Sequence, residues 1–216
     1  MLAKLIIVGG GEHARVVAQV ACSQPDRWNV EGFVDVQSCD QTQVGMGLRR
    51  LGQDEDLEAL LRQDSSRVLV LGVGKGPGSD RRRQIVQSIA VSSERWASVI
   101  DVSARVYSGV RIGHGVVVMP GAMVNCGASL SDHCVINTGA IVEHDVRVGE
   151  FVQVAPGAVI GGGAVLEHDS YVGLGARVRD HVVIASGATV AMGGVVVSHV
   201  AAGNTVMGVP AKVRTK

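Results

Sequence analysis

A glycine-rich segment near the amino terminus has the residue types that bind a phosphate group. Gly9-Gly10-Gly11-Glu12-His13-Ala14 follows the apolar run Leu5–Val8 and fits the pattern G-x-G-x-x-A. Glycines let the backbone approach a phosphate closely, and the amino end of the following helix favours negative charge. Asp35 ends the next expected strand, where its carboxylate can accept hydrogen bonds from a ribose or a base. The same pattern also fits a structural turn in any Rossmann-like domain.

A histidine between two carboxylates occurs twice, as Glu143-His144-Asp145 and as Glu167-His168-Asp169. An imidazole takes up and releases a proton near neutral pH, which suits acid–base chemistry. Side chains of neighbouring residues on a straight strand point in opposite directions, so His144 can contact Asp145 only at a corner of the chain. The two triplets are twenty-four residues apart, and most histidines at such corners have no chemical role.

The histidines and cysteines are not spaced like the ligands of a metal ion. No two of the seven histidines are five residues apart, so the H-x4-H pair of a carbonic-anhydrase-like zinc site is missing from the sequence. His181 and His199 are eighteen residues apart and should stack. Cys126 lies eighteen residues before His144, where a buried corner thiol is favoured over a thiol nucleophile. We therefore expect no bound metal.

A six-residue repeat must position most of these residues. From Ile100 to Val196, every sixth residue is Ile, Val or Leu, at seventeen consecutive positions. The residue four places further on is always small or Val, and the residue three places on is Gly in ten of the seventeen hexads. Positions zero and four share one side of a strand, so both side chains face an interior, and small residues allow a bend at each corner. Three faces per turn give an all-β parallel β-helix in which residues eighteen apart stack.

Strands and helices alternate before the repeat, which indicates a small parallel α/β domain of the Rossmann type. We expect this domain at residues 1–97 and the β-helix with its C-terminal tail at residues 98–216. Arg81–Arg83 opens the last helix and is equally consistent with a solvated face. The expected strands are Leu5–Val8, Val30–Val34 and Val68–Val73, and the expected helices are His13–Cys22, Asp54–Gln63 with Asp54 as its cap, and Asp80–Ala90.

The composition excludes several classes of partner. Lys and Arg number 20, as do Asp and Glu, so no net field attracts nucleic acid or an anionic membrane. The four cysteines form no CxxC pair, which suits a reducing compartment. The apolar run that ends at Gly11 is too short for a signal peptide or a membrane span. We expect a soluble, cytoplasmic protein.

Four segments together resemble one family. Gly9–Ala14, Asp35 after a strand, Ile136–Asp145 with its sequence INTGAIVEHD, and Gly208–Lys212 with its sequence GVPAK are similar to hexapeptide-repeat nucleotide-sugar acetyltransferases. That family contains the N-acetyltransferases of nucleotide-linked 4-amino sugars and the sialic acid O-acetyltransferases. The resemblance covers nearly the whole chain. It implies a left-handed coil, although the period alone does not set the hand.

The resemblance implies roles for residues of the β-helix. His144 would be the general base that removes a proton from a sugar amine as the amine attacks an acetyl thioester, and Asp145 would orient it. Asn137 would hold the acceptor or the base. The backbone N–H of Gly162, eighteen residues after His144, would donate to the thioester oxygen.

The resemblance also implies two substrates and an assembly. Acetyl-CoA, the co-substrate, would lie between neighbouring β-helices of a homotrimer, with Gly208, Pro210 and Lys212 near its distal end. A UDP- or GDP-linked amino sugar would contact Gly10, His13 and Asp35. Transfer would be direct, in a ternary complex, without a metal.

Three positions depart from the family pattern. Gln153 stands where members commonly have a second histidine, nine residues after the base. Asp101–Ala104 replaces a His-Pro-Ser-Ala sequence at the start of the β-helix, and Lys75–Ser79 replaces a loop that contains asparagine. These changes bear on proton transfer and on the nucleotide contacts.

Three other functions fit part of the pattern. A sialic acid O-acetyltransferase would use the same β-helix on a hydroxyl acceptor. A non-catalytic protein could bind nucleotide sugars on an inactive β-helix. A nicotinamide oxidoreductase rests only on the G-x-G-x-x-A segment, and a first domain of about ninety residues is short for a complete dinucleotide fold.

Overall fold

The computed structural model describes residues 2–36, 47–74 and 76–214. The chain divides into two compact units, one made of Met1–Gly74 and Arg81–Val99, the other of Lys75–Asp80 and Ile100–Lys216. Lys75, the first residue of the predicted loop Lys75–Ser79, lies outside the described residues. In the part of the chain that is described, no helix has the length and apolarity needed to cross a membrane.

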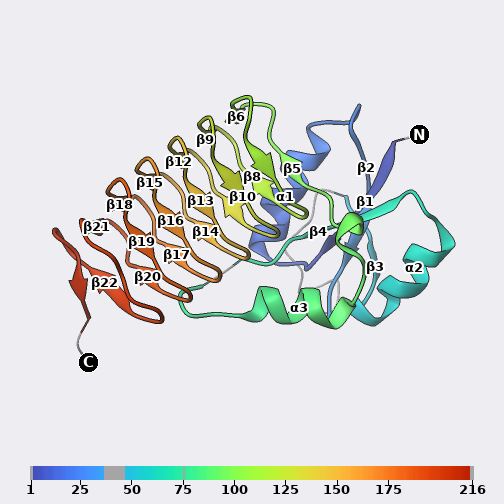
Figure 1. Ribbon diagram of the computed structural model, residues 1–216. Helices are drawn as coiled ribbons and strands as arrows, with labels where there is room; N and C mark the ends of the chain where they lie inside the picture. Colours follow the sequence, from blue (N-terminus) through green and yellow to red (C-terminus); the bar gives the residue numbers. More distant parts are fainter. Residues whose placement is uncertain (1, 37–46, 75, 215–216) are drawn as a thin grey trace. The chain divides into compact units, whose positions relative to one another are not determined.

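The first unit is built on a four-stranded parallel sheet with the strand order β3-β2-β1-β4 (Figure 1). The carboxyl-terminal halves of β1 and β4 are buried apolar runs, as is usual for parallel strands. α1 buries Ala14, Val17, Ala18 and Ala21, which recur at the spacing of one helical face. The elements in chain order are β1 (Ala3–Val8), α1 (Glu12–Cys22), β2 (Trp28–Val34), β3 (Arg50–Gly52), a 3₁₀ turn (Asp54–Asp56), α2 (Leu57–Gln63), β4 (Arg67–Leu71), α3 (Arg81–Ile89) and a second 3₁₀ turn (Ser93–Arg95).

Two details of the predicted α/β pattern are wrong. The strand β3 was not expected, because Arg50–Gly52 contains only one large apolar residue. Asp54 does not cap the second helix, because the chain first forms the 3₁₀ turn Asp54–Asp56 and α2 begins only at Leu57. Gln53 caps that turn instead, and its backbone N–H donates to Asp56 Oδ2 at 2.8 Å.

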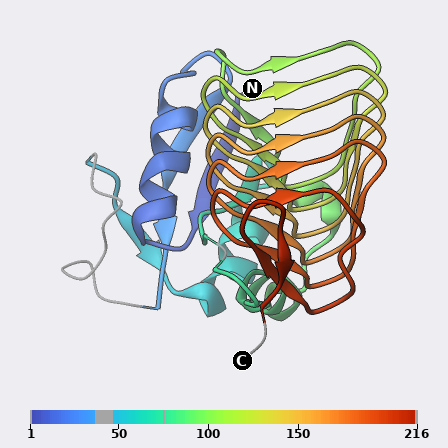
Figure 2. The same ribbon diagram turned by 90° about the vertical axis from the view of Figure 1, so that its left-hand side faces the viewer.

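The second unit is a left-handed parallel β-helix, which confirms the predicted fold class. Each hexad forms a two-residue strand, and strands eighteen residues apart pair in parallel, as β10, β13 and β16 do. Figure 2 shows the coils as stacked layers. Three sheets result, with the orders β23-β22-β20-β17-β14-β11-β8-β5, β21-β18-β15-β12-β9-β6 and β19-β16-β13-β10-β7. We call the second of these sheets the β12 face.

From β5 to β21 the strands follow the hexads without a slip, whereas β22 pairs with β20 at a spacing of sixteen residues. The strand bounds reflect both spacings. They are β5 (Val99–Ile100), β6 (Arg105–Val106), β7 (Arg111–Ile112), β8 (Val117–Val118), β9 (Met123–Val124), β10 (Ser129–Leu130), β11 (Val135–Ile136), β12 (Ile141–Val142), β13 (Arg147–Val148), β14 (Gln153–Val154), β15 (Val159–Ile160), β16 (Val165–Leu166), β17 (Tyr171–Val172), β18 (Arg177–Val178), β19 (Val183–Ile184), β20 (Thr189–Val190), β21 (Val195–Val196), β22 (Thr205–Met207) and β23 (Lys212–Val213).

The interior of the β-helix is filled as the repeat predicts. The repeated Ile, Val and Leu residues are buried from Val118 to Val196 and pack with the small residues four places on in one apolar cluster. The first three repeated residues are less buried, because they lie near the end of the coil: Ile100 and Val106 are partly buried, and Ile112 is 36% exposed.

The corners of the β-helix have a left-handed backbone. The third residue after each repeated aliphatic has a positive φ in every hexad from Gly109 to Gly193. A side chain in this conformation costs roughly 1–2 kcal/mol, less for Asp and Asn. Glycine fills most of these positions, and the exceptions are His133, Asp145, Phe151, Asp169 and His181.

Candidate active site

His144 and Asp145 lie together at the corner that follows β12. The Nδ1 atom of His144 is 2.9 Å from Asp145 Oδ2, and the two side chains are 57% and 70% exposed. Asp145 has a φ of 59°, and this left-handed turn brings two neighbouring side chains to the same side. We call the stacked corner residues Cys126, His144, Gly162 and Asp180 the His144 edge.

The carboxylates around His144 prepare its ring to accept a proton. The hydrogen bond that His144 donates to Asp145 raises the pKa of His144, and the charges of Asp145 and Glu143 add to this effect. When Nδ1–H donates to Asp145, the neutral ring leaves Nε2 as its proton acceptor. The exposed ring can therefore act as a base through Nε2.

Glycines above and below this pair leave room for the two side chains. A Cβ atom on Gly162 would lie 2.6 Å from His144 Nε2, and one on Gly127 would lie 2.3 Å from Asp145 Oδ1. The ring of His144 therefore lies against the bare backbone of Gly162. Gly162 is buried, and its N–H has no acceptor among the described residues. This donor would be available to a ligand that reaches the backbone beside the ring.

Glu143 and Asn125 were not predicted to belong to this site. Glu143 Oε2 accepts a hydrogen bond of 2.9 Å from Asn125 Nδ2. The two residues are eighteen apart, so the repeat itself places one above the other. That spacing was visible in the sequence and was the signal that could have revealed the contact.

Asn137 and Gln153 lie at other places on the β-helix. Asn137 belongs to the corner before β12, so the strand separates it from His144, and its Oδ1 accepts the N–H of Thr138 at 2.8 Å. Gln153 is 7% exposed and lies on β14, in a different sheet from β12. One chain therefore does not bring Asn137 and His144 side by side.

The segment Gly208–Lys212 closes one end of the β12 face. It joins β22 to β23, and its backbone pairs with β21: Val195 N–H donates to Gly208 O at 3.0 Å and Ala211 N–H donates to Val195 O at 2.7 Å. Gly208, Pro210 and Lys212 are exposed. The loop of this hairpin therefore extends the β12 face, and His144 lies at one edge of that face.

The glycine loop of the first unit borders a separate pocket of about 350 Å³. Gly10 N–H donates to Asp35 Oδ2, so this carboxylate supports the loop as well as facing the pocket. The lining residues are Gly9–His13, Asp35, Gly72–Gly74 and Arg81. The predicted contacts Gly10, His13 and Asp35 therefore lie around one cavity.

His13 and Arg82 are placed differently from what their sequence context suggests. Burial lowers the pKa of His13 to about 4, with the charge of Arg82 as a second cause, so the ring is neutral at pH 7. Its Nε2 atom is covered and has no partner among the described residues. Arg82 is only 2% exposed, so Arg81–Arg83 is not a fully solvated face.

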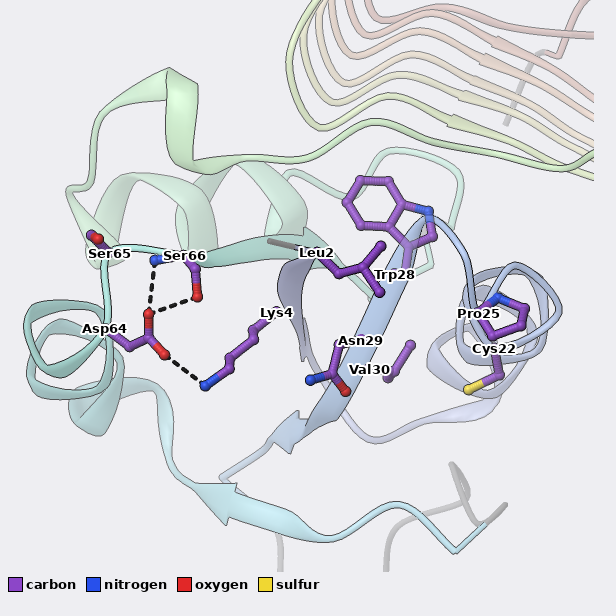
Figure 3. A pocket seen from close by; sticks show the side chains of 10 residues that line it. All are labelled: Leu2, Lys4, Cys22, Pro25, Trp28, Asn29, Val30, Asp64, Ser65 and Ser66. Atoms are coloured by element: carbon purple, nitrogen blue, oxygen red, sulfur yellow. Dashed lines mark hydrogen bonds and ion pairs between the residues drawn. The ribbon is translucent and has the colours of Figure 1, made fainter.

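A second pocket of the first unit, of about 610 Å³, lies at the amino end of the sheet (Figure 3). Trp28, Leu2 and Val30 line its apolar side. On its polar side, Asp64 accepts hydrogen bonds from Lys4 Nζ at 2.7 Å and from Ser66. This pocket is larger than the one at the glycine loop, but Lys4, Asp64 and Ser66 already pair with one another. Its size alone therefore assigns no chemistry to it.

The second Glu-His-Asp triplet has the same local geometry at another corner. His168 Nδ1 is 3.2 Å from Asp169 Oδ2, and Asp169 also has a positive φ. Glu167 Oε2 accepts two hydrogen bonds of 2.9 Å from Ser186, one from its hydroxyl and one from its N–H. These bonds hold the pKa of Glu167 below its usual range.

The structure also places Cys126 and His199, the remaining thiol and imidazole candidates from the sequence. Cys126 is exposed, so the expectation of a buried corner thiol is wrong. His199 Nδ1 accepts the N–H of Val183 at 2.9 Å, a structural contact. Within residues 2–36, 47–74 and 76–214, no three His, Cys, Asp or Glu side chains gather where they could hold a metal ion.

Comparison with known proteins places the chain in a family. Residues 4–89 match the family model described as the PglD N-terminal domain. The acetyltransferase domain of PglB from Neisseria gonorrhoeae, solved with acetyl coenzyme A, is 31% identical, with 99% of this chain and 100% of that chain covered and a TM-score of 0.87. The chain belongs to the hexapeptide-repeat nucleotide-sugar acetyltransferases.

Other solved structures match nearly the whole length of the chain. PerB from Caulobacter crescentus, solved with CoA and GDP-perosamine, is 30% identical, with 100% of this chain and 99% of that chain covered and a TM-score of 0.85. WeeI from Acinetobacter baumannii is 21% identical over 97% of this chain and 99% of its own, with a TM-score of 0.78, and shows the fold alone. A search of curated proteins gave no match.

Proposed function

We propose that the protein transfers an acetyl group from acetyl-CoA to the amine of a UDP- or GDP-linked 4-amino-deoxy sugar. The observation that carries this proposal is the exposed His144–Asp145 pair beside the bare backbone of Gly162. The relatives of about 30% identity support it, because one was solved with acetyl coenzyme A and another with CoA and GDP-perosamine.

In the proposed reaction, the amine nitrogen attacks the thioester carbon directly. His144 Nε2 takes a proton from this nitrogen as the C–N bond forms, and Asp145 stabilises the imidazolium. The N–H of Gly162 donates to the carbonyl oxygen, which gains negative charge. The C–S bond then breaks, the amide is released, and the proton on His144 passes to the leaving thiolate to give CoA-SH.

The two substrates would approach from different parts of the chain. Acetyl-CoA would follow the β12 face from His144 to the hairpin, where Gly208, Pro210 and Lys212 contact its distal end. The neutral ring of His13, with Gly10 and Asp35, would hold the nucleotide sugar at the glycine loop. Both substrates are cytoplasmic metabolites, so we place the protein in the cytoplasm.

A homotrimer would complete this site. On the β12 face, Met123, Ile141 and Val159 point outward and are half-buried, and at the corner before that face Leu174 and Met192 are 50% and 75% exposed. This apolar surface is suited to packing against a second copy. Asn137, which lies at the same corner, would then act in the site of a neighbouring copy.

A substrate screen tests the proposal. Purified protein is mixed with acetyl-CoA and with UDP-, GDP-, dTDP- and CMP-linked amino sugars, and released CoA is followed with a thiol reagent. We expect thiol release with a UDP- or GDP-linked 4-amino sugar and an N-acetylated product by mass and NMR. Acetylation of a sialic acid hydroxyl, or binding without any thiol release, would refute the proposal.

A further inference from the structure

Glu143 is a carboxylate with one oxygen anchored and the other open. Its Oε2 accepts the hydrogen bond from Asn125 Nδ2 at 2.9 Å and a longer contact of 3.4 Å from the N–H of His144. Its Oε1 accepts no hydrogen bond from any residue that the structure describes. A carboxylate can accept about four hydrogen bonds, so Glu143 keeps capacity for a ligand next to His144.

Asn125 determines the direction in which Glu143 points. Because Asn125 lies one coil before Glu143, the carboxylate turns away from the following coil, where Gly161–Gly163 carry no side chains. Both residues are half-buried, so the Glu143 side chain loses rotamer freedom before a ligand arrives. Glu167 in the second triplet turns the other way, because Ser186 of the following coil binds it.

The charge around His144 distinguishes an amine from a hydroxyl. With the ring neutral, Glu143 and Asp145 give this corner two negative charges. An aliphatic amine is largely protonated at neutral pH and is attracted to such a corner, whereas a hydroxyl is neutral and is not. The charge of Glu143 also contributes to the raised pKa of His144.

We propose that Glu143, held by Asn125, is the specificity residue that receives the positively charged amine of the acceptor beside His144. This inference rests on the proposed function, in which His144 is the base. The bound ammonium releases one proton to water at this exposed corner, and the resulting amine then attacks the thioester. Glu143 thereby favours amine acceptors over hydroxyl acceptors at the same carbon.

The test compares Glu143→Gln, Asn125→Ala and, as a matched control, Glu167→Gln in the full-length protein. Steady-state rates are measured with the best amino sugar of the substrate screen and with the same nucleotide sugar carrying a hydroxyl instead of the amine. For Glu143→Gln we expect the KM for the amine to rise about tenfold, and the ratio of kcat/KM for amine over hydroxyl to fall by about the same factor. Asn125→Ala should show a smaller change in the same direction, and Glu167→Gln none.

The pH profile separates this role from a merely structural one. Removal of the Glu143 charge lowers the pKa of His144, so the acid limb of kcat should move to lower pH in Glu143→Gln, measured from about pH 6 to pH 9. Circular dichroism verifies that each variant is folded. The inference alone is overturned if the wild type is active and Glu143→Gln keeps three wild-type properties: the KM for the amine, the ratio of kcat/KM for amine over hydroxyl, and the acid limb of kcat. A wild type that acetylates no amino sugar overturns the proposed function, and the inference with it.

Discussion

The two Glu-His-Asp triplets have the same residues, the same left-handed corner and the same contact between imidazole and carboxylate, yet they differ in what lies one coil above them. Gly161–Gly163 follow the first triplet by eighteen residues, and Ala185-Ser186-Gly187 follow the second. The bare backbone of Gly162 leaves room for the ring of His144, and the buried N–H of this glycine has no acceptor among the described residues. Above His168, the side chain and N–H of Ser186 are committed to Glu167.

The aspartates of the two triplets also differ, and again the first corner is the more open one. Asp145 is 70% exposed, whereas Asp169 is only 19% exposed. His144 and His168 are almost equally exposed, at 57% and 60%. Exposure of the ring therefore does not distinguish the two corners. In a β-helix, the residues eighteen positions away decide whether a corner can take a ligand.

The largest expected effect is the loss of the base at the first triplet. His144→Ala should lower kcat by two or more orders of magnitude, because the carboxylates that remain at that corner are much weaker bases than an imidazole. Thiol release with acetyl-CoA and the amino sugar measures kcat, and size-exclusion chromatography with light scattering checks that the assembly persists. Near-normal turnover in a folded assembly would exclude His144 as the base.

Closing the space above His144 should have the next largest effect. In Gly162→Ala, the new Cβ would lie 2.6 Å from Nε2, so the flexible ring must turn away while the backbone stays in place. We expect kcat to fall roughly ten- to a hundredfold with little change in Tm. The matched change Ser186→Ala above His168 should leave kcat unchanged. Equal effects of the two substitutions would contradict the comparison.

Neutralising the carboxylate partner of His144 should have an intermediate effect and change the pH dependence. Asp145 raises the pKa of His144, so Asp145→Asn lowers that pKa, and the neutral ring persists to lower pH. The acid limb of kcat should therefore move to lower pH, while the plateau falls about tenfold because the ring is a weaker base. A pH–rate profile measures both quantities. An acid limb that stays in place or moves to higher pH would contradict this prediction.

The smallest expected effect is at the second triplet. His168→Ala should change kcat and KM by less than about twofold, because Ser186 occupies Glu167 and leaves no comparable binding space. The same thiol-release assay applies. A loss similar to that of His144→Ala would show that the two corners do not differ in function.

The fold of the second unit could be predicted because its contacts repeat along the chain. Each buried aliphatic packs on residues six and eighteen positions away, so the sequence register and the spatial register coincide. The first unit was predicted less completely, because β3 has no apolar run and, among the strands that the structure describes, pairs with β2 alone. Arg82 was missed for a similar reason: nothing in an Arg-Arg-Arg run indicates which residue faces the interior.

The candidate site could be predicted only in part. The corner contact of His144 and Asp145 follows from the positions of these residues in the hexad. The hydrogen bond between Asn125 and Glu143 also follows the spacing of eighteen, but many pairs share this spacing without touching through their side chains. The direction in which Glu143 turns depends on Asn125 one coil before it and on the glycines one coil after it. The six-residue repeat does not predict this choice of rotamer. The functional roles of these residues stay predictions.

The position of the C-terminal hairpin has a consequence for the length of molecule that the β12 face can accommodate. Three strand layers, or about 14 Å at ~4.8 Å per layer, separate β12 from β21, to which the loop of the hairpin is hydrogen-bonded. This span can change only by whole coils. Adding or removing eighteen residues after Gly163 changes the span by one layer and keeps every later residue at its corner. Adding or removing six residues instead moves all later residues to another face of the β-helix. A protein lengthened by one whole coil should thus favour a longer thiol carrier than the protein described here.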